Sequence, residues 1–101
     1  MAVTSAGTDR ELTLSVSGEV DHHAAASIMA ELERQVEERL PRKLTMGLGG
    51  VTFMDSSGIA VILRAHRRMG ALGGSLTVRA VPSQAAKVLR AAGLERIVRF
   101  E

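Results

Sequence analysis

The sequence predicts a single α/β domain with a central mixed sheet of about five strands, flanked by three helices. Short apolar segments with the two-residue period of strands alternate with three segments of helical period. The chain has 101 residues, 46% hydrophobic and none of them cysteine, which allows one apolar core without disulfides. When helices join parallel strands, the carboxyl ends of the strands meet at one edge of the sheet. We therefore expect the functional loops at that edge.

The first half of the chain predicts an edge strand, a half-buried strand and a long helix. Ala2–Ala6 is predicted as the edge strand, and Glu11–Ser17 alternates apolar and polar residues until Gly18 should break the strand. Asp21 stands where a helix N-cap belongs, because its carboxylate can accept from free backbone N–H groups, and Pro41 should end the helix. The expected apolar side of this helix comprises Ala25, Ile28, Met29, Leu32, Val36 and Leu40.

The middle of the chain predicts a central strand and a second helix. Leu44–Leu48 is the expected strand, Gly49–Gly50 a turn, and Val51–Met54 a separate apolar stretch. A helix follows the polar residues 55–58 and should end at the glycine cluster between residues 70 and 74. Its expected inner face comprises Ile59, Ile62, Leu63, His66 and Met69. We interpret His66 as a core or boundary residue.

The last third predicts a strand, a third helix and a final strand. Leu76–Ala80 is the expected strand, Pro82–Ser83 should open the helix, and Gly93 should close it. Ile97–Phe100 is expected to form the last strand. The inner side of the helix should comprise Ala85, Val88, Leu89 and Ala92.

Charge and composition narrow the classes of function. Residues 1–56 contain 5 basic and 9 acidic side chains, whereas residues 57–101 contain 8 basic and 2 acidic ones. We interpret the basic excess as solvated helix faces, and expect the acidic half to meet a basic patch on a partner protein. Only Phe53 and Phe100 are aromatic, which disfavours base stacking with nucleic acid. With no long apolar run and no secretion signal, we expect a cytoplasmic protein without membrane contact.

The segment from Phe53 to Ile59 is the main candidate site, because it is a strand that leads into a helix start with two serines. Asp55, Ser56 and Ser57 are ordinary helix caps, so capping alone is one interpretation. Two features favour a functional interpretation of this segment. Gly58 should leave room for another protein, and a phosphate on Ser57 should meet free N–H groups at the positive end of the helix.

A phosphate on Ser57 would add about −1.5 to −2 charge at neutral pH. Beside Asp55 and the acidic residues Glu19 and Asp21, this charge should oppose the docking of a partner without remodelling the fold. The sequence thus predicts a switch that acts at the surface.

The segment from Gly18 to His23 is the second candidate. Consecutive helical residues point about 100° apart, so His22 and His23 are poorly placed to chelate one metal ion, and no metal or cofactor is expected. Asp21 is expected to contact the partner or to orient the hydroxyl of Ser57. A hydrolase triad of Ser57, His22 and Asp21 is disfavoured, because the serine lacks a G-x-S-x-G elbow. We therefore predict no catalytic activity.

Three segments together resemble the STAS domain of anti-sigma factor antagonists, most closely the anti-sigma-F factor antagonists of spore-forming bacteria. They are Gly18–His23, Phe53–Gly58, and Gly93–Leu94 followed by Ile97–Phe100. They occur in the family's order over about residues 11–101. The resemblance implies a STAS domain that spans residues 1–101.

The resemblance also implies partners and a mechanism. The unphosphorylated antagonist binds an anti-sigma factor that is also a serine kinase, and thereby releases the sigma factor. The kinase phosphorylates the serine that matches Ser57, and a serine phosphatase restores it. Asp21 matches a position at the partner interface. The expected partner-binding residues are Glu19, Asp21, Asp55, Ser56, Ser57, Gly58 and Ile59.

Two departures from the family pattern are visible. Gly47 stands where the family usually has Asp or Asn, so the local sheet stability should differ. The sequence stops at Glu101, where relatives often continue into a last helix, and an uncovered surface would favour self-association. A STAS accessory module of a lipid or anion transport system, without a phosphorylation switch, remains the alternative.

Overall fold

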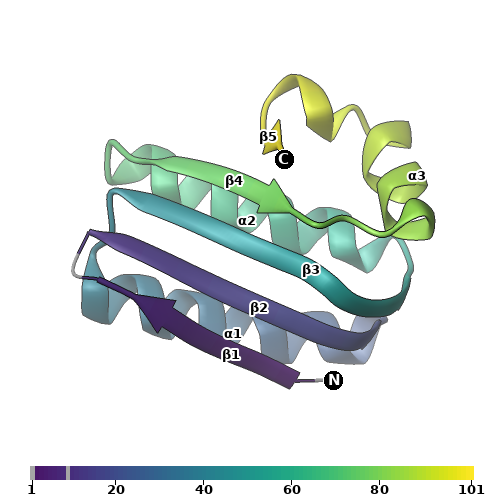
Figure 1. Cartoon of the computed structure of the whole chain (residues 1–101), viewed down its shortest axis with the longest axis horizontal. Coiled ribbons are helices and arrows are strands. Elements are labelled where there is room, and N and C mark those ends of the chain that lie inside the picture. Colours follow the sequence, from purple (N-terminus) through teal and green to yellow (C-terminus); the bar gives the residue numbers. More distant parts are fainter. Residues whose placement is uncertain (1, 9) are drawn as a thin grey trace.

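The computed structural model describes residues 2–8 and 10–101 and forms one five-stranded mixed sheet (Figure 1). The strands lie in the order β1-β2-β3-β4-β5; β1 is antiparallel to β2, and the other neighbours are parallel. The elements are β1 (Ala2–Gly7), β2 (Glu11–Val20), α1 (His22–Arg39), β3 (Lys43–Met54), α2 (Ser57–Ala71), β4 (Ser75–Arg79), α3 (Ser83–Ala91), the 3-10 helix η1 (Leu94–Arg96) and β5 (Arg99–Phe100). The predicted fold class is confirmed.

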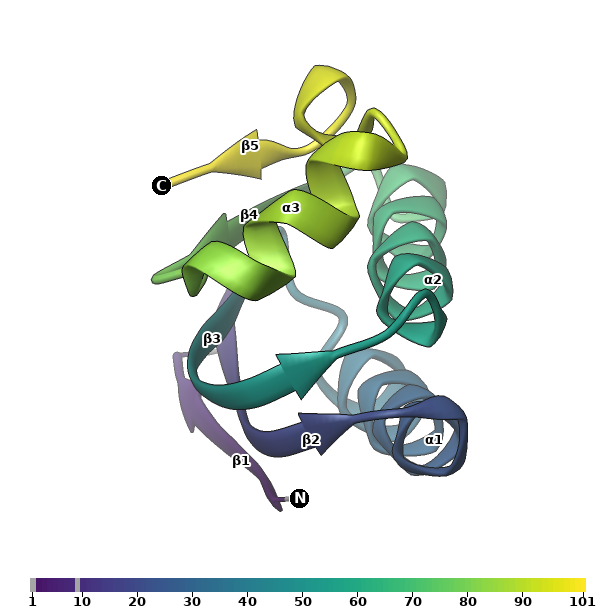
Figure 2. The same cartoon turned by 90° about the vertical axis from the view of Figure 1, so that its right-hand side faces the viewer.

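The hydrophobic core lies between the sheet and two helices. Helices α1 and α2 cover one face of the sheet, and α3 lies beside the upper strands (Figure 2). Alternation along the strands supplies the sheet side of this core, which includes Leu12, Leu14, Leu44, Met46, Leu76 and Val78. Burying such a side chain stabilises the fold by about 1.5–3 kcal/mol. The other face of the sheet bears small polar residues, among them Thr13, Ser15, Thr45 and Thr77.

Strand β2 continues past the glycine that was expected to break it. Gly18 has a φ of 87° and lies within the strand, which ends at Val20. The register with β3 shifts between Gly18 and Glu19, so the glycine accommodates an irregularity instead of a loop. The prediction that Gly18 begins the loop was therefore wrong, and only Asp21 separates β2 from α1.

Strand β3 is one bent strand, not two strands joined by a turn. Two register shifts against β2 place extra residues in β3 and let the strand curve. A Cβ on Gly50 would lie 2.8 Å from the Cβ of Ser17, so the glycine permits a close approach between the strands. The predicted turn at Gly49–Gly50 was wrong because a glycine pair suits a bulged strand as well as a turn.

Helix α1 begins and ends with identifiable caps. The side chain of Asp21 caps its start, as predicted, and Arg34 pairs with Glu38 at 3.1 Å on the exposed side. Hydrogen bonds from Arg34 and then Gln35 lower the pKa of Glu31. Leu40 was expected on the apolar face, but it is 60% exposed and adopts a left-handed φ of 45° as the C-cap.

The buried face of helix α2 is rotated from the expected one. Its buried residues are Gly58, Val61, Ile62, Ala65 and Met69, whereas the predicted Ile59, Leu63 and His66 are only half-buried. The helix packs against both the sheet and α1, and these two contacts together set which side of it is buried. On the outer side, Glu33 of α1 lies 3.0 Å from Arg68 and 3.5 Å from Arg64.

The C-terminal part differs from the prediction in detail. In α3, Ala85, Ala86 and Leu89 are buried, whereas Val88 is half-buried and Ala92 is exposed. The predicted last strand shrinks to β5, because η1 turns the chain just before it. Ile97 is 49% exposed in this turn. Over the described residues, no helix combines the length and apolar character needed to cross a membrane.

Candidate functional site

The two candidate loops meet at the carboxyl edge of the sheet. Val20 and Met54 are register partners at the ends of β2 and β3, and the N–H of Asp55 donates to the carbonyl of Val20 at 3.1 Å. Asp21 and Asp55 therefore follow neighbouring strand ends, where α1 and α2 begin side by side (Figure 2). The predicted juxtaposition of the two loops is confirmed.

Asp21 is fixed by its capping role. Its Oδ1 atom accepts from the N–H of Ala24 at 2.8 Å, and the residue is half-buried. Glu19 is exposed at the end of β2. A shallow hollow of about 440 Å³ is lined by Glu19, Asp21, His23, Ala24 and Ser27. The carboxylate of Asp21 is thus held at the rim of an acidic, accessible surface.

The carboxylate of Asp55 caps α2. Its Oδ1 atom accepts from the N–H of Ser57 at 2.7 Å, and its carbonyl accepts from the N–H of Gly58 at 3.0 Å. The N–H of Ile59 donates to the carbonyl of Ser56 at 3.1 Å. The expectation of free N–H groups for a phosphate on Ser57 was therefore wrong, because the chain's own oxygens already occupy these three donors.

Ser57 is the first residue of α2 and is half-buried, whereas Ser56 is exposed. Ser56 has a helical φ of −61°, and its side chain makes no capping bond. An anion added to Ser57 would lie beside the carboxylate that caps the same N–H group. The N–H groups of Ser57, Gly58 and Ile59 would not be free to receive it.

Gly58 is buried against the core. A Cβ at this position would lie 2.4 Å from Sδ and 2.5 Å from Cγ of Met54, which is 2% exposed. The prediction that Gly58 leaves room for another protein was therefore wrong, because Met54 fills that room. Ile59 is half-buried and packs against the core. These two residues seat the helix on the sheet.

Two residues at this edge were not among the expected partner-binding residues. Phe53, the register partner of Glu19, is 46% exposed and offers an apolar surface beside the acidic residues. Its place next to inward-pointing Met54 in an alternating strand was the signal for its exposure. Gln84 of α3 binds the backbone of Met54, a contact across 30 residues that no local pattern indicates.

The histidines show no organised site. His22 and His23 are exposed in the first turn of α1, and half-buried His66 lines an apolar hollow of about 300 Å³ with Met69 and Ile97. In the described part of the chain, no three His, Cys, Asp or Glu side chains gather as a metal site requires. Among the hydrogen bonds found there, none joins Ser57 to a histidine.

Comparison with known proteins agrees with this geometry. The sequence model of the STAS domain family matches residues 2–101 of this chain. The anti-sigma F factor antagonist of Paenibacillus polymyxa is 30% identical over 87 residues, which cover 86% of this chain and 74% of the relative. The antagonist of the same name from Lysinibacillus sphaericus is 29% identical over 87 residues, with the same coverage.

Solved structures share the fold. The unphosphorylated anti-sigma factor antagonist SpoIIAA superposes with a TM-score of 0.85 at 24% identity, covering 99% of this chain and 88% of that one. An anti-sigma factor antagonist from Mycobacterium paratuberculosis gives 0.87 at 22% identity, covering 98% and 83%. Phosphorylated SpoIIAA from Bacillus gives 0.76 at 24% identity, covering 99% and 91%.

The chain therefore belongs to the STAS domain family. Within that family it groups with the anti-sigma factor antagonists, which are regulatory binding proteins.

Proposed function

We propose that this domain binds an anti-sigma factor that is also a serine kinase, and that phosphorylation of Ser57 ends the binding. In the unphosphorylated state the domain competes for the anti-sigma factor and releases the sigma factor. A serine phosphatase restores the binding state. The domain acts in the cytoplasm as a binding partner and kinase substrate, without catalysis, cofactor or direct contact with nucleic acid or membrane. The observation that carries this proposal is the serine pair at the start of α2, beside the capping aspartates of both helices.

The proposed contact surface is the carboxyl edge of the sheet. It comprises Glu19, Asp21, Asp55, Ser56, Ser57, Gly58 and Ile59, and we add Phe53 because its exposed ring lies beside Glu19. Gly58 and Ile59 would act mainly by shaping this surface, since both pack inward. The acidic side chains are complementary in charge to a basic patch on the kinase. The kinase also binds the ATP that it uses.

The phosphorylation step places charge where the partner docks. The Oγ atom of Ser57 attacks the γ-phosphorus of ATP, the bond to the leaving ADP oxygen breaks, and the hydroxyl proton passes to a base of the kinase. The product bears about −1.5 to −2 charge next to Asp55. Repulsion, added bulk and incomplete desolvation then oppose the complex.

Variants of Ser57 test this function. With a purified anti-sigma factor kinase and ATP, the unmodified domain should gain one phosphate by mass spectrometry, and Ser57→Ala should gain none. Ser57→Ala should still bind the kinase in calorimetry, because only the modified group is lost. Ser57→Asp should bind more weakly by about tenfold or more, since each 1.4 kcal/mol of repulsion changes the affinity tenfold.

Ser56→Ala is the matched control, because this neighbouring serine is exposed and does not cap the helix. It should still gain one phosphate by mass spectrometry, because Ser57 is intact. Equal binding by Ser57→Ala and Ser57→Asp would remove the electrostatic mechanism. Absence of any phosphorylation, with intact Ser57, would favour an accessory STAS module without a switch.

A further inference from the structure

The carboxyl end of β3 has one backbone edge without a neighbouring strand, and one side chain hydrogen-bonds to this edge at Met54. In the described sheet, β4 pairs with β3 only from Lys43 to Gly47, whereas β3 continues to Met54. On its other side, β2 accompanies β3 to the end, and the N–H of Asp55 donates to Val20. Backbone groups along such an unaccompanied edge need other partners or water.

Gln84 supplies these partners to Met54. Its Oε1 atom accepts from the N–H of Met54 at 2.8 Å, and its Nε2 atom donates to the carbonyl of the same residue at 2.7 Å. A primary amide presents one acceptor and two donors, so this side chain can reproduce the pairing that a further strand would give. We call this pair of hydrogen bonds the Gln84 clasp.

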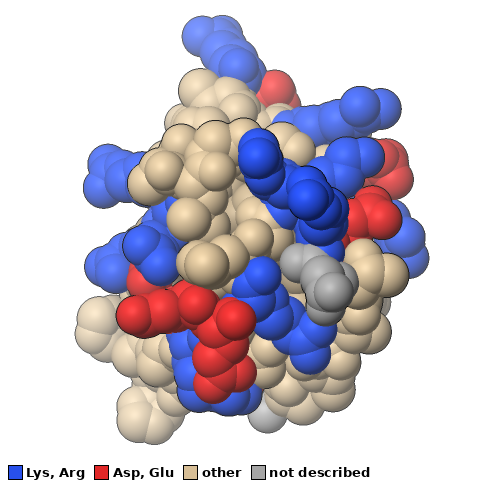
Figure 3. All heavy atoms as spheres, turned by 90° about the vertical axis from the view of Figure 1, so that its left-hand side faces the viewer, with Lys and Arg blue, Asp and Glu red and all other residues tan. Residues whose placement is uncertain are grey.

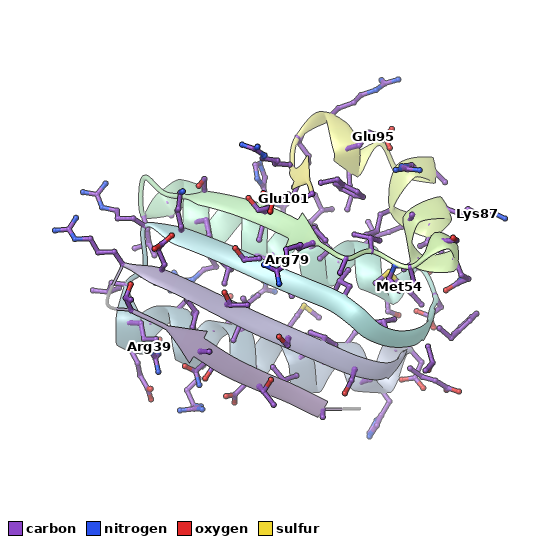
Figure 4. The ribbon with its side chains drawn as sticks, in the orientation of Figure 1. Arg39, Met54, Arg79, Lys87, Glu95 and Glu101 are labelled. Carbon is purple, nitrogen blue, oxygen red and sulfur yellow. The ribbon has the colours of Figure 1, made fainter. Side chains whose placement is uncertain are left out.

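Met54 supports the start of α2, where Ser56 and Ser57 lie. Its side chain is 2% exposed and fills the space in front of Gly58 in α2. Its backbone stands one residue before Asp55, whose carboxylate holds the N–H of Ser57 at 2.7 Å. A shift of the Met54 backbone would therefore move the cap and the start of α2 together. Figure 4 shows Met54 at the end of β3 that faces α3.

We propose that Gln84 is a positioning residue, which through the Gln84 clasp holds the Ser57 hydroxyl in place for phosphoryl transfer. The inference rests on the proposed phosphorylation of Ser57. It assigns α3 a role in the switch, although α3 contains none of the acidic or hydroxyl residues expected to meet the partner.

The first test measures the clasp itself. Amide exchange of Met54, followed by NMR in the full chain, should be about three- to tenfold faster in Gln84→Ala, as the loss of a typical net hydrogen-bond contribution predicts. Gln84→Glu should protect this amide better than Gln84→Ala, because its carboxylate can still accept from the Met54 N–H although it cannot donate to the Met54 carbonyl. Lys87→Ala should leave the exchange unchanged, since Lys87 is exposed and points away from the sheet on the same helix (Figure 4).

The second test measures positioning. With the anti-sigma factor kinase and ATP, Gln84→Ala should lower kcat/KM for Ser57 by about tenfold, because small displacements of a reacting group are costly. The loss should lie mainly in kcat, since the side chain of Gln84 is outside the proposed contact surface. Val88→Ala, which loosens α3 without touching the clasp, should lower the unfolding temperature but retain the rate.

The outcomes separate the two proposals. Unchanged Met54 exchange, or faster exchange with unchanged phosphorylation kinetics, would overturn the role of Gln84. A similar loss of rate in Val88→Ala would also overturn it, because general loosening of α3 would then suffice. If the unmodified chain is not phosphorylated at all, the proposed function fails, and with it any positioning role, while Met54 exchange still reports whether the clasp exists.

Discussion

Asp55 performs the capping task that serines often perform at a helix start. Its carboxylate accepts from Ser57, while the N-cap residue Ser56 makes no side-chain capping bond. Among the described residues, the start of α2 therefore does not depend on a serine hydroxyl. Modification of Ser57 at its oxygen removes no capping bond, which fits a residue whose side chain is kept for a partner.

Asp21 combines a structural and an electrostatic role, and two substitutions can separate them. Asp21→Ala removes the bond to Ala24 and should destabilise the fold by about 1 kcal/mol. Asp21→Asn retains an oxygen that can accept this bond. It should therefore lower the free energy of unfolding by only a few tenths as much as Asp21→Ala does. Urea unfolding measures both.

Binding to the kinase then tests the charge of Asp21 alone. Asp21→Asn should weaken the complex several-fold at low salt, mainly through slower association, and the difference should shrink at high salt. The exposed His22, adjacent in sequence, offers a control in His22→Gln, which leaves the carboxylates intact. Unaltered affinity of Asp21→Asn at every salt concentration would exclude an electrostatic contact at this residue.

At the scale of elements, the glycines of β3 have different roles. A Cβ on Gly47 would meet Ser15, at 3.5 Å from its Oγ and 4.0 Å from its Cα, which are ordinary contacts on the polar face of the sheet. Gly47→Ala should therefore stabilise the domain by about 0.5–1 kcal/mol, because glycine loses more backbone entropy on folding. A thermal or urea unfolding curve gives the value.

Gly50→Ala is the matched comparison in the same strand. Its Cβ would lie 2.8 Å from the Cβ of Ser17 and 3.3 Å from the Cα of that residue, so the two strands would have to separate. We expect a loss of about 1–3 kcal/mol, as in other overpacked sites. If both variants changed stability in the same direction, the bulged pairing of β2 and β3 would need another explanation.

At the scale of the whole molecule, the two ends of the parallel strands differ in charge, although Glu11 lies beside Lys43 at the more basic end. The end opposite the serines bears Arg10, Arg39, Arg42 and Lys43, all exposed, and Arg42 and Lys43 both donate backbone N–H groups to the carbonyl of Arg10. Figure 3 shows lysine and arginine side chains spread over this face, with a smaller number of acidic side chains among them. A partner with a basic patch would thus be attracted to one end and repelled from the other.

Phosphorylation should leave this architecture unchanged. The backbone around Ser57 is held by Asp55 and Val20, and the added group requires no rearrangement of the core. In ¹⁵N-labelled protein, shifts should be confined to the ends of β2 and β3 and the starts of α1 and α2. The amides of Arg42 and Lys43 at the basic end serve as the internal reference. Shifts spread through β4 and β5 would contradict a switch limited to the surface.

Local chemistry allowed much of the fold and the site to be predicted. Strand alternation, the cap at Asp21 and the glycine ends of α2 and α3 each follow from a few adjacent residues. The meeting of the two loops followed from the handedness of the connections between parallel strands. These features require no knowledge of distant contacts.

The remaining features depend on tertiary structure. Gly49–Gly50 is compatible with a turn or a bulge, and only pairing with β2 selects the bulge. Gly58 is an unremarkable residue in the sequence until Met54 is found against it. The bond between Gln84 and Met54 spans 30 residues, so it became visible only when α3 was placed beside the strand end.

The occupied amides at the start of α2 have a further consequence for reversibility. Because the N–H groups of Ser57, Gly58 and Ile59 already donate to Asp55 and Ser56, a phosphate ester on Ser57 would have to compete with these oxygens for the same donors. Under the proposed function, a phosphate that the domain does not hold would be as easy to remove as to add. If Ser57 is phosphorylated as proposed, the balance between the two states would be set by the kinase and the phosphatase and not by the domain itself.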